Sequence, residues 1–409
     1  MSLIVQKYGG SSVANAERLR NVARRVASSR EQGDQVVVVV SAMGDTTDEL
    51  VELAHEMAEH PEPREMDLLL STGEIISVTL VSMALHSLGI PAISLTGAQA
   101  GIQTDSFFSR ARILNVEPSR VRQELDGDKV VLVAGFQGIS AEQDVTTIGR
   151  GGSDTTAVAM ACALNAEECQ IYTDVEGVFT ADPRVVADAR KLSEISYDEM
   201  LELASLGARV MHPRAVELGA VHGMPILVAS SFTDQRGTLI HEVDTNSMEV
   251  RNKVRGIAHD TDVAKITLVG VPDRPGIAAS LFAPLASAGI SVDTIVQNAG
   301  LSKTTDLTFT VSRGDLSHAM GLVEPVSRQI GARECVSASD LGKVSIVGSG
   351  IQNAPGYAAR MFEALFEAGI NIEMITTSEI RITCVVHEAQ VADAVRALHR
   401  AFELEKPEE

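Results

Sequence analysis

Short apolar runs alternate with amphipathic segments through about the first 240 residues of the chain. Residues 3–7 predict a strand, and the five consecutive valines at residues 36–40 are typical of a parallel strand that is covered on both faces. Apolar residues at helical spacing predict a helix between these two strands. Residues 129–134 and 168–173 predict further strands, which end in glycine or aspartate. This alternation predicts a three-layer α/β/α domain, in which ligands bind beyond the carboxyl ends of the strands.

The last third of the chain contains an internal repeat. Pro275 and Gly289 recur as Pro355 and Gly369, each after 80 residues. Each copy has the pattern strand, Pro-Gly turn, helix, glycine, strand, strand, helix. This order predicts two α+β modules of the ferredoxin-like βαββαβ type.

The second copy is shorter than the first at its end. After a predicted helix at residues 389–402, only an acidic tail with one proline remains, and such a tail is a poor strand. The strand-like residues 254–258 precede the first copy and have no partner of their own. We therefore expect them to complete the second module, so that the first module is inserted within the second. The expected domains are residues 1–245, a linker at 246–262, and modules at 263–339 and 340–409.

The composition narrows the function classes. The 34 basic and 55 acidic residues give a net charge of −21, which argues against nucleic acid or an anionic membrane as the main partner. Aromatic residues make up 3% of the chain and tryptophan is absent, so we expect no base-stacking surface. No leader sequence or membrane-spanning apolar run is expected, and the four scattered cysteines form no C-x-x-C pair. We expect a cytoplasmic protein without a zinc site or a disulfide framework.

The first candidate ligand loop, residues 7–12, closes the first strand and opens the first helix. Glycines at positions 9 and 10 let the backbone approach a ligand closely, and a helix N-terminus favours an anion. Lys7 would add a positive charge to the same crevice. The loop matches neither the Walker A pattern nor the dinucleotide-binding pattern of glycines. The alternative is an ordinary strand-to-helix turn with a solvated lysine.

A second candidate loop, residues 149–156, opens the apolar helix at residues 157–163. It combines glycines with Arg150, whose guanidinium can form a fork with a carboxylate or a phosphate. Ser153 and Asp154 favour the start of a helix. A capped helix after a flexible loop is the alternative, but capping requires neither the arginine nor three glycines. The pattern therefore favours an anion-binding function.

Two further segments are weaker signals when they are taken alone. Residues 172–184 leave a strand through acidic residues and a Gly-Val-Phe turn, which could enclose a base and a ribose. Glu74 lies near the start of a long apolar helix, where a glutamate is often only a favourable partner of the helix dipole. An ordinary turn and an ordinary helix start are the alternatives.

Together these motifs resemble the aspartate kinase family of the amino-acid kinase superfamily. The resemblance covers essentially the whole chain, and the paired C-terminal modules are similar to the ACT amino-acid-sensing domains of that family. The motifs that carry it are residues 7–12, 39–43, 149–156, 173–184 and 207–217. The resemblance implies transfer of the ATP γ-phosphate to the side-chain carboxylate of L-aspartate, with Mg²⁺ as the metal. This is the first step toward lysine, threonine and methionine.

The resemblance also implies roles for individual residues. Arg150 would hold the substrate α-carboxylate and Glu74 its ammonium group, while Lys7 would neutralise charge on the transferring phosphoryl group. The other implied substrate-binding residues are Ser41, Thr47 and Ser153. Asp154, which with Lys7 is an implied catalytic residue, would organise the site together with Ser153. The implied nucleotide contacts are Lys7, Tyr8, Gly9, Gly10, Thr173, Asp174, Phe179, Asp182, Arg184 and Arg209. Arg209 departs from the family, which usually has a lysine there; His212, nearby, is interpreted as structural.

In the paired ACT modules the resemblance implies a bound amino acid. The matching residues are Asp273, Arg274, Pro275, Gly276, Ile277, Ala278, Asp293, Thr294, Gln297 and Asn298 in the first module, and Asn353, Ala354, Pro355, Gly356, Asn371 and Ile372 in the second. We expect feedback inhibition by lysine, threonine or both, and a homo-oligomer or an α/β hetero-oligomer formed through these modules. The alternative is a pair of modules used only for dimerisation.

Two rival functions remain at this point. A non-catalytic amino-acid sensor with a degenerate kinase domain would require losses at Lys7, Glu74, Arg150 or Asp154, and none of these residues is lost. A kinase for another small acid is the closer rival, because the dimensions of a pocket cannot be read from a sequence.

Overall fold

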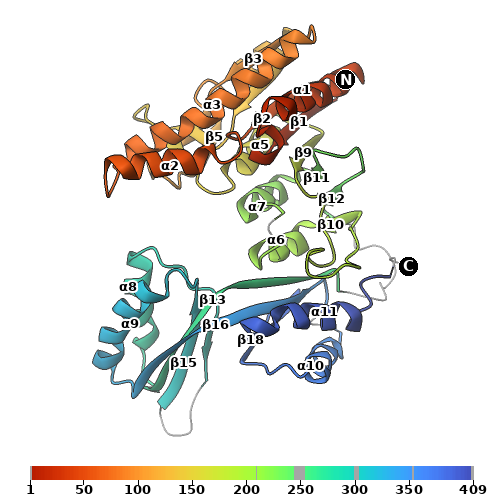
Figure 1. Cartoon of the computed structure of the whole chain (residues 1–409). Helices are drawn as coiled ribbons and strands as arrows, with labels where there is room; N and C mark the ends of the chain where they lie inside the picture. The colour runs from red at the N-terminus through yellow and green to blue at the C-terminus, as the bar shows by residue number, and fades with distance from the viewer. Residues whose placement is uncertain (1, 209, 244–253, 299–303, 352–353, 407–409) are drawn as a thin grey trace. The chain divides into compact units, whose positions relative to one another are not determined.

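The computed structural model describes residues 2–208, 210–243, 254–298, 304–351 and 354–406 (Figure 1). Contacts divide the chain into two compact units. The first unit comprises Met1–Phe179 and Lys191–Glu249, and the second comprises Thr180–Arg190 and Val250–Glu409.

An eight-stranded sheet forms the centre of the first unit, with the strand order β10-β12-β11-β9-β1-β2-β6-β3. Most neighbouring strands run parallel, and only β11 and β12 pair antiparallel. The strands are β1 (Leu3–Tyr8), β2 (Gln35–Val40), β3 (Ala92–Leu95), β6 (Val130–Ala134), β9 (Glu168–Thr173), β10 (Glu194–Ser196), β11 (Ile226–Ser230) and β12 (Thr238–His241). Because Tyr8 lies opposite both Val40 and Tyr172, the carboxyl ends of β1, β2 and β9 share one edge.

Helices cover both faces of this sheet, as expected for three layers. Alternate residues of β1, β2 and β6 pack with α1 and α3 in one core cluster. Helix α5 is buried almost throughout and packs on β1, β2 and β9. The helices of the unit are α1 (Ala16–Glu31), α2 (Thr46–Met57), α3 (Pro63–Ser87), α4 (Ser119–Asp126), α5 (Gly152–Leu164), α6 (Tyr197–Ser205) and α7 (Pro213–His222). Local signals fix several starts: the Asn15 side chain caps α1, and Ser196 with Glu199 forms a capping box on α6.

A small second sheet, absent from the sequence prediction, lies in the same unit. Its strand order is β5-β4-β7-β8. The strands are β4 (Ile102–Thr104), β5 (Ile113–Val116), β7 (Gln137–Ile139) and β8 (Val145–Thr147). Because β8 leads directly into the loop before α5, this sheet positions the loop that contains Arg150.

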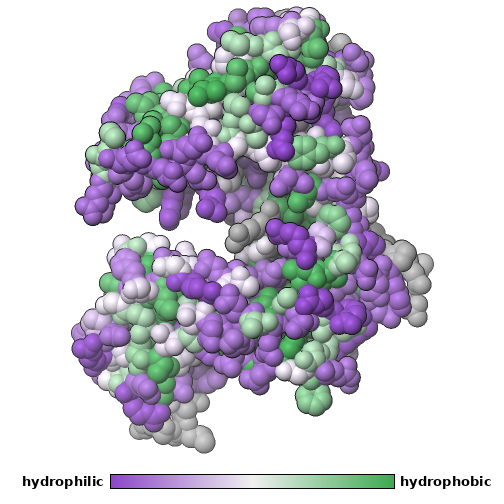
Figure 2. All heavy atoms as spheres, in the orientation of Figure 1, coloured by the Kyte–Doolittle hydropathy of each residue, from purple (hydrophilic) through white to green (hydrophobic). Residues whose placement is uncertain are grey.

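Helix α3 differs from one sequence expectation. Among the described residues it is long and apolar enough to cross a bilayer, although no such run was expected. Half of its apolar stretch is buried, and the acidic side chains of Asp67 and Glu74 are buried on it. It is therefore a core helix of the first unit. Figure 2 shows apolar atoms on the visible surface around α2 and α3, where Ile76 and Met83 are among the exposed side chains.

The second unit is built on one six-stranded sheet with the order β14-β15-β13-β16-β18-β17. Helices α8 and α9 pack on the first module, and α10 and α11 on the second. The strands are β13 (Gly256–Pro272), β14 (Ile295–Gln297), β15 (Thr304–Val311), β16 (Glu334–Val347), β17 (Met374–Thr377) and β18 (Arg381–His387). The helices are α8 (Ile277–Ser287), α9 (Leu316–Ile330), α10 (Tyr357–Glu367) and α11 (Val391–Ala401).

Two long strands, β13 and β16, run through both modules. The start of β13, from Gly256 to Asp260, pairs with Val347 to Lys343 of the second module, which is the pairing anticipated for residues 254–258. The later part of β13 pairs with β15 and with the first half of β16. The expected boundaries at residues 262/263 and 339/340 therefore fall inside continuous strands. The two modules share a single sheet.

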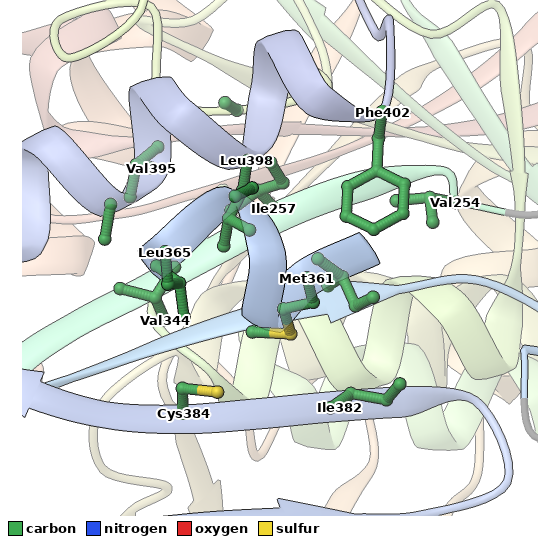
Figure 3. Packing of buried hydrophobic residues seen from close by; sticks show 14 of the residues in the cluster. Val254, Ile257, Val344, Met361, Leu365, Ile382, Cys384, Val395, Leu398 and Phe402 are labelled. Carbon is green, nitrogen blue, oxygen red and sulfur yellow. The ribbon is translucent and has the colours of Figure 1, made fainter. Parts of the chain in front are cut away.

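Residues of the expected kinase domain contribute to the core of the second module. This core contains Ile257, Met361, Leu398 and Phe402 (Figure 3), and Ala181 and Val186 pack in the same cluster. The Ile257 N–H donates to the Thr180 carbonyl at 2.8 Å, and the Thr180 hydroxyl lies 3.0 Å from Nε2 of the buried His399. The segment Thr180–Arg190 thus belongs to the second unit, although the sequence assigned it to a continuous domain 1–245.

Candidate active site

Lys7 and Asp154 come from distant parts of the sequence and form an ion pair in the first unit. Lys7 lies near the carboxyl end of β1, and Asp154 is in the first turn of α5. The distance from Lys7 Nζ to Asp154 Oδ1 is 2.6 Å, and both side chains are about nine-tenths buried. A buried ammonium group needs such a partner, because removing an unpaired charge from water is costly.

The loop between β8 and α5 requires its glycines. Gly149 and Gly151 both have left-handed backbone conformations, with φ of 81° and 72°. A Cβ atom at Gly151 would lie 2.2 Å from the ring of His212, so only glycine fits there. His212 is the N-cap of α7 and accepts a hydrogen bond from the Arg214 backbone N–H, which agrees with its interpretation as a structural residue.

Glu74 is a buried carboxylate with one unsatisfied oxygen. Gly73 brings α3 close to the loop after β2, since a Cβ atom there would lie 2.9 Å from Cβ of Ala42. The Ala42 N–H donates to Glu74 Oε1 at 3.1 Å, whereas no donor among the described residues reaches Oε2. Burial raises the pKa of Glu74 to about 7, and the hydrogen bond from Ala42 opposes this rise.

These groups line one cavity of about 260 Å³ at the carboxyl edge of the sheet. Eight of the residues implied by the resemblance to have a role meet there. Of the other residues in the lining, Ala42 and the glycines at 149, 151 and 152 lie within the motifs noted in the sequence, whereas Gly44 and Phe136 do not. The implied residues in its lining are Lys7, Gly10, Ser41, Thr47, Glu74, Arg150, Ser153 and Asp154. The additional residues are Ala42, Gly44, Phe136, Gly149, Gly151 and Gly152.

The charges in this cavity suit a small zwitterion and a phosphate. Glu74 offers an unpaired oxygen to an ammonium group, and Arg150 offers a guanidinium fork to a carboxylate. Lys7 and the N-terminus of α5 both favour a second anion, such as a phosphate group. Arg150 forms no ion pair with any residue in the described part of the chain, so its positive charge is available to a ligand.

Several of the residues expected around the nucleotide contact other parts of the protein in this structure. The Tyr8 ring is buried and stacks on Tyr172, with ring centroids 5.0 Å apart, so its side chain faces the core. The Gly9 N–H donates to the Tyr172 carbonyl at 3.3 Å, and the expected contact from this amide to a phosphate therefore has no free donor in this conformation. The Thr173 hydroxyl donates to Asp174.

Three other nucleotide residues belong to different surroundings. Phe179 forms an isolated antiparallel bridge with Lys191, and both residues belong to the first unit. Asp182 and Arg184 lie in the second unit and form an ion pair of 2.8 Å, which lowers the pKa of Asp182. Arg209 lies outside the described residues.

Some of the expected effector residues form the Pro-Gly turns of the second unit. Gly276 and Gly356 adopt left-handed conformations at the starts of α8 and α10, with φ of 94° and 108°. Asp293, expected to hold an ammonium group, already pairs with Lys343, because that buried amine needs a counter-charge. Any ligand ammonium would compete with Lys343 for this carboxylate.

The other effector residues are placed as follows. Gln297 is exposed on β14, and the Asn298 carbonyl accepts the Thr305 hydroxyl. Asn371 donates to Glu373, and Ile372 packs against the core of the second module. Asp273 and Arg274 precede the first turn and are exposed, Ile277 is buried, and Ala278 and Ala354 flank the turns. Thr294 is buried, and its N–H donates to the Thr310 hydroxyl at 3.2 Å. Asn353 lies outside the described residues.

Sequence reasoning missed the residues that hold the Arg150 loop. Asp67 is fully buried on α3 and accepts hydrogen bonds from Ser109 and Thr147. Arg214 donates to the carbonyls of Ile148 and Ala111. An acidic residue in an apolar helix, seven positions before Glu74, was the available signal for Asp67, because that spacing places both on one face.

Known protein families match both units. The amino acid kinase family matches residues 2–230, and ACT domains match residues 265–326 and 344–402. Aspartate kinase Ask_LysC of Stutzerimonas stutzeri is 49% identical over 407 residues, which cover 100% of this chain and 98% of that protein. An aspartokinase of Pseudomonas aeruginosa is 50% identical over 407 residues, with 100% and 99% covered.

Solved structures give the same result. Escherichia coli aspartokinase III in complex with aspartate and ADP (R-state) matches with a TM-score of 0.79 and 25% identity, covering 98% of this chain and 99% of that one. The complex of aspartokinase III with lysine and aspartate (T-state) matches with a TM-score of 0.76 and 26% identity, with the same coverage.

Proposed function

The chain belongs to the aspartate kinase family of the amino acid kinases, and we propose that it transfers the γ-phosphoryl group of ATP to the side-chain carboxylate of L-aspartate. The products are ADP and 4-phospho-L-aspartate. The observation that carries the proposal is the single cavity in which Lys7, Glu74, Arg150 and Asp154 meet. The related E. coli structure that contains aspartate and ADP supports the same substrate pair.

In this proposal the substrate is held by its charged groups. Arg150 binds the α-carboxylate, and the unpaired Oε2 of Glu74 accepts from the α-ammonium group. Ser41, Thr47 and Ser153 line the remaining wall and offer hydroxyl groups. The side-chain carboxylate of aspartate is then directed toward the phosphoryl group.

Catalysis requires alignment and charge neutralisation more than proton transfer. A carboxylate is already a nucleophile near neutral pH and needs no general base, in contrast to a hydroxyl group. Lys7 neutralises the charge that spreads over the transferring phosphoryl oxygens, and the N-terminus of α5 supports it. Asp154 keeps the Lys7 ammonium in place through the 2.6 Å ion pair.

Magnesium fits this site as an ion carried chiefly by the nucleotide. No three carboxylates, imidazoles or thiolates converge among the described residues, so the protein offers no complete ligand set of its own. Mg²⁺ commonly uses one or two carboxylates together with substrate phosphates and water, and Asp154 is the carboxylate nearest to Lys7. When bound, the ion would neutralise charge on the phosphates.

The second unit is proposed to sense the end products lysine, threonine or both. Its ACT domains and the related structure in complex with lysine support this assignment. Inhibition requires that the effector bind one arrangement of the enzyme more tightly than another. We also propose that the enzyme initiates the synthesis of lysine, threonine and methionine in the cytoplasm and assembles through its ACT domains, as a homo-oligomer or an α/β hetero-oligomer.

A hydroxamate assay tests the reaction directly. The purified protein is incubated with ATP, Mg²⁺ and hydroxylamine, together with aspartate, glutamate or acetylglutamate, with and without lysine plus threonine. We expect hydroxamate from aspartate and little from the other two acids, and inhibition by at least one effector. Greater turnover of glutamate or acetylglutamate would contradict the substrate, whereas activity on aspartate without any inhibition would contradict only the regulatory part.

A further inference from the structure

We infer that Asp67 is a positioning residue for aspartate: it fixes the loop that carries Arg150 and so determines the affinity for the substrate α-carboxylate. This inference rests on the proposed role of Arg150. Asp67 is fully buried in α3. Its Oδ2 accepts from the Thr147 N–H at 2.7 Å and from the Ser109 N–H at 2.9 Å, and its Oδ1 accepts from the Thr147 hydroxyl at 2.7 Å.

The donors around Asp67 require a carboxylate. No cation among the described residues pairs with it, so hydrogen bonds alone compensate for burying its charge. An ionised carboxylate only accepts, and its two oxygens can serve all of these donors at once. Asparagine has the same shape but only one acceptor oxygen. With that oxygen facing the Thr147 N–H, its NH₂ group could donate to the Thr147 hydroxyl, which can rotate and accept, but it would also oppose the Ser109 N–H, which lies 3.0 Å from the Oδ1 position.

One of the two residues that donate to Asp67, Thr147, lies three positions before Arg150 in the chain. Thr147 is the last residue of β8, and Arg150 follows after Ile148 and Gly149. Ser109 lies beside the same loop, since a Cβ atom at Gly149 would be 2.8 Å from the Ser109 carbonyl oxygen. Asp67 therefore joins the turn at Ser109 to the start of the Arg150 loop.

Arg214, on α7, also joins the segment around Ser109 to the start of the Arg150 loop. It donates to the Ile148 carbonyl at 2.8 Å and to the Ala111 carbonyl at 3.2 Å. The Ala111 N–H in turn donates to the Thr147 carbonyl at 2.9 Å. Asp67 accepts hydrogen bonds from both the Ser109 turn and β8, and Arg214 donates hydrogen bonds to carbonyl groups of the same two segments. The loop is thus held by two buried or half-buried charged side chains from different helices.

Helix α3 connects this arrangement to the other end of the substrate. Asp67 and Glu74 are seven residues apart, so they lie on nearly the same face and about 10 Å apart along the axis. Glu74 fixes the loop after β2 through the Ala42 N–H, and Asp67 fixes the Arg150 loop. One rigid helix therefore sets the spacing between the groups that bind the ammonium and the carboxylate. A small displacement of either end would weaken binding strongly.

Steady-state kinetics of the full-length protein test this inference. For Asp67→Asn we expect the KM for aspartate to rise about tenfold or more, with kcat and the KM for ATP within about threefold. Thr147→Val removes one hydroxyl donor and keeps the shape, so the KM for aspartate should rise only a few-fold; this variant also provides the test if Asp67→Asn does not fold. Glu124→Gln is the matched control, because Glu124 is a buried carboxylate paired with Arg120 and Lys129 away from the cavity.

A double variant separates positioning from general destabilisation. Because Asp67 acts through Arg150, the pair Asp67→Asn and Arg150→Ala should raise the KM for aspartate no further than Arg150→Ala alone. The inference would be overturned if the effects of the two substitutions on the KM for aspartate multiply in the double variant. It would also be overturned if the KM of Asp67→Asn equals that of the Glu124→Gln control. Either result would leave the proposed function intact. If Arg150→Ala itself leaves the KM for aspartate unchanged, the assignment of Arg150 fails and this inference fails with it.

Discussion

Glu74 should make aspartate binding depend on pH near neutrality. Its pKa of about 7 in the empty site results from burial. Glu74 is then about 90% ionised at pH 8 and about 10% ionised at pH 6. Only the ionised form attracts the substrate ammonium group. We therefore expect the KM for aspartate to rise about tenfold from pH 8 to pH 6, while kcat changes little because bound substrate keeps Glu74 ionised.

The magnitude follows from the cost of charging Glu74. A rise in pKa from 4.5 to about 7 corresponds to about 3 kcal/mol of lost stability of the charged form. Glu74→Gln removes the charge but keeps an oxygen for the Ala42 N–H. We expect this variant to raise the KM for aspartate about 10²-fold at pH 8, the scale of a buried charged hydrogen bond, and to remove its pH dependence.

The same shift predicts the stability of the ligand-free protein. A carboxyl group whose pKa is raised by folding contributes stability below pH 4.5, and this contribution is lost as the pH rises toward 7. The free energy of unfolding of Glu74→Gln, relative to that of the parent protein, should therefore increase between about pH 5 and pH 7 and then level off.

Initial rates at varied aspartate concentration, measured by ADP release from pH 6 to 8, provide the assay, and thermal unfolding of the ligand-free protein provides the second readout. Glu65→Gln is the control, because Glu65 is an exposed carboxylate on the same helix. A KM for aspartate that is flat across this pH range, or a Glu74→Gln variant that keeps the pH slope, would refute the reasoning.

Three further predictions concern charge, backbone and stability. Lys7→Ala should lower kcat about 10²-fold with a nearly unchanged KM for aspartate in steady-state kinetics, because the charge acts on the phosphoryl group. Gly151→Ala should lower the melting temperature and raise the KM for aspartate, since its Cβ would lie 2.2 Å from the His212 ring in a left-handed conformation. Because burial lowers the pKa of His399 from 6.5, its stabilising contact with Thr180 should be complete above pH 6.5 and weaken as the pH falls; urea unfolding between pH 7.5 and 5.5 measures this.

Each of these has a control in the chain. A Lys7→Ala variant with normal kcat and a raised KM would contradict the catalytic role. Gly223→Ala tests backbone strain alone, because Gly223 has a φ of 61° and a Cβ atom there would meet nothing within 4 Å, so it should cost less than Gly151→Ala. His399→Gln should reduce the change in the free energy of unfolding between pH 7.5 and pH 5.5. His259→Gln is the control, because it should keep the contribution of His399 to that change.

The sequence indicated residues that line the cavity, but not the residues that hold those residues in position. Lys7 and Arg150 could be identified because strand ends and glycine loops converge at one edge of a parallel sheet. Asp67 could not, because a single acidic residue in a helix is usually exposed, and its burial depends on donors 42 and 80 positions away in the chain. Those contacts depend on the small sheet, whose strands of three or four residues carry too little pattern to be predicted.

The second unit shows a similar limit. The repeat predicted both modules, but not that β13 and β16 would continue through them, because strand continuity depends on pairing between distant segments. The segment Thr180–Arg190 was assigned by its position in the chain to the kinase domain. Its apolar residues Ala181 and Val186 are too few to indicate a core in the sequence. In the structure they pack in the core of the second module.

The distribution of charge in the cavity explains which acids it can distinguish. In the proposed mechanism Lys7, which pairs with Asp154 at 2.6 Å, acts on the phosphoryl group, so Glu74 and Arg150 remain as the charges that the small acid must complement. An acid that lacks an α-ammonium group would leave the buried Oε2 of Glu74 ionised and unsatisfied, or would force it to take up a proton. Acetylated acids should therefore be rejected by charge. Glutamate presents the same two charged groups as aspartate, so its rejection must depend on the distance from those groups to the phosphoryl donor. In our proposal Asp67 and Glu74 on α3 hold the loops that bind the two charged groups, and so fix one end of that distance.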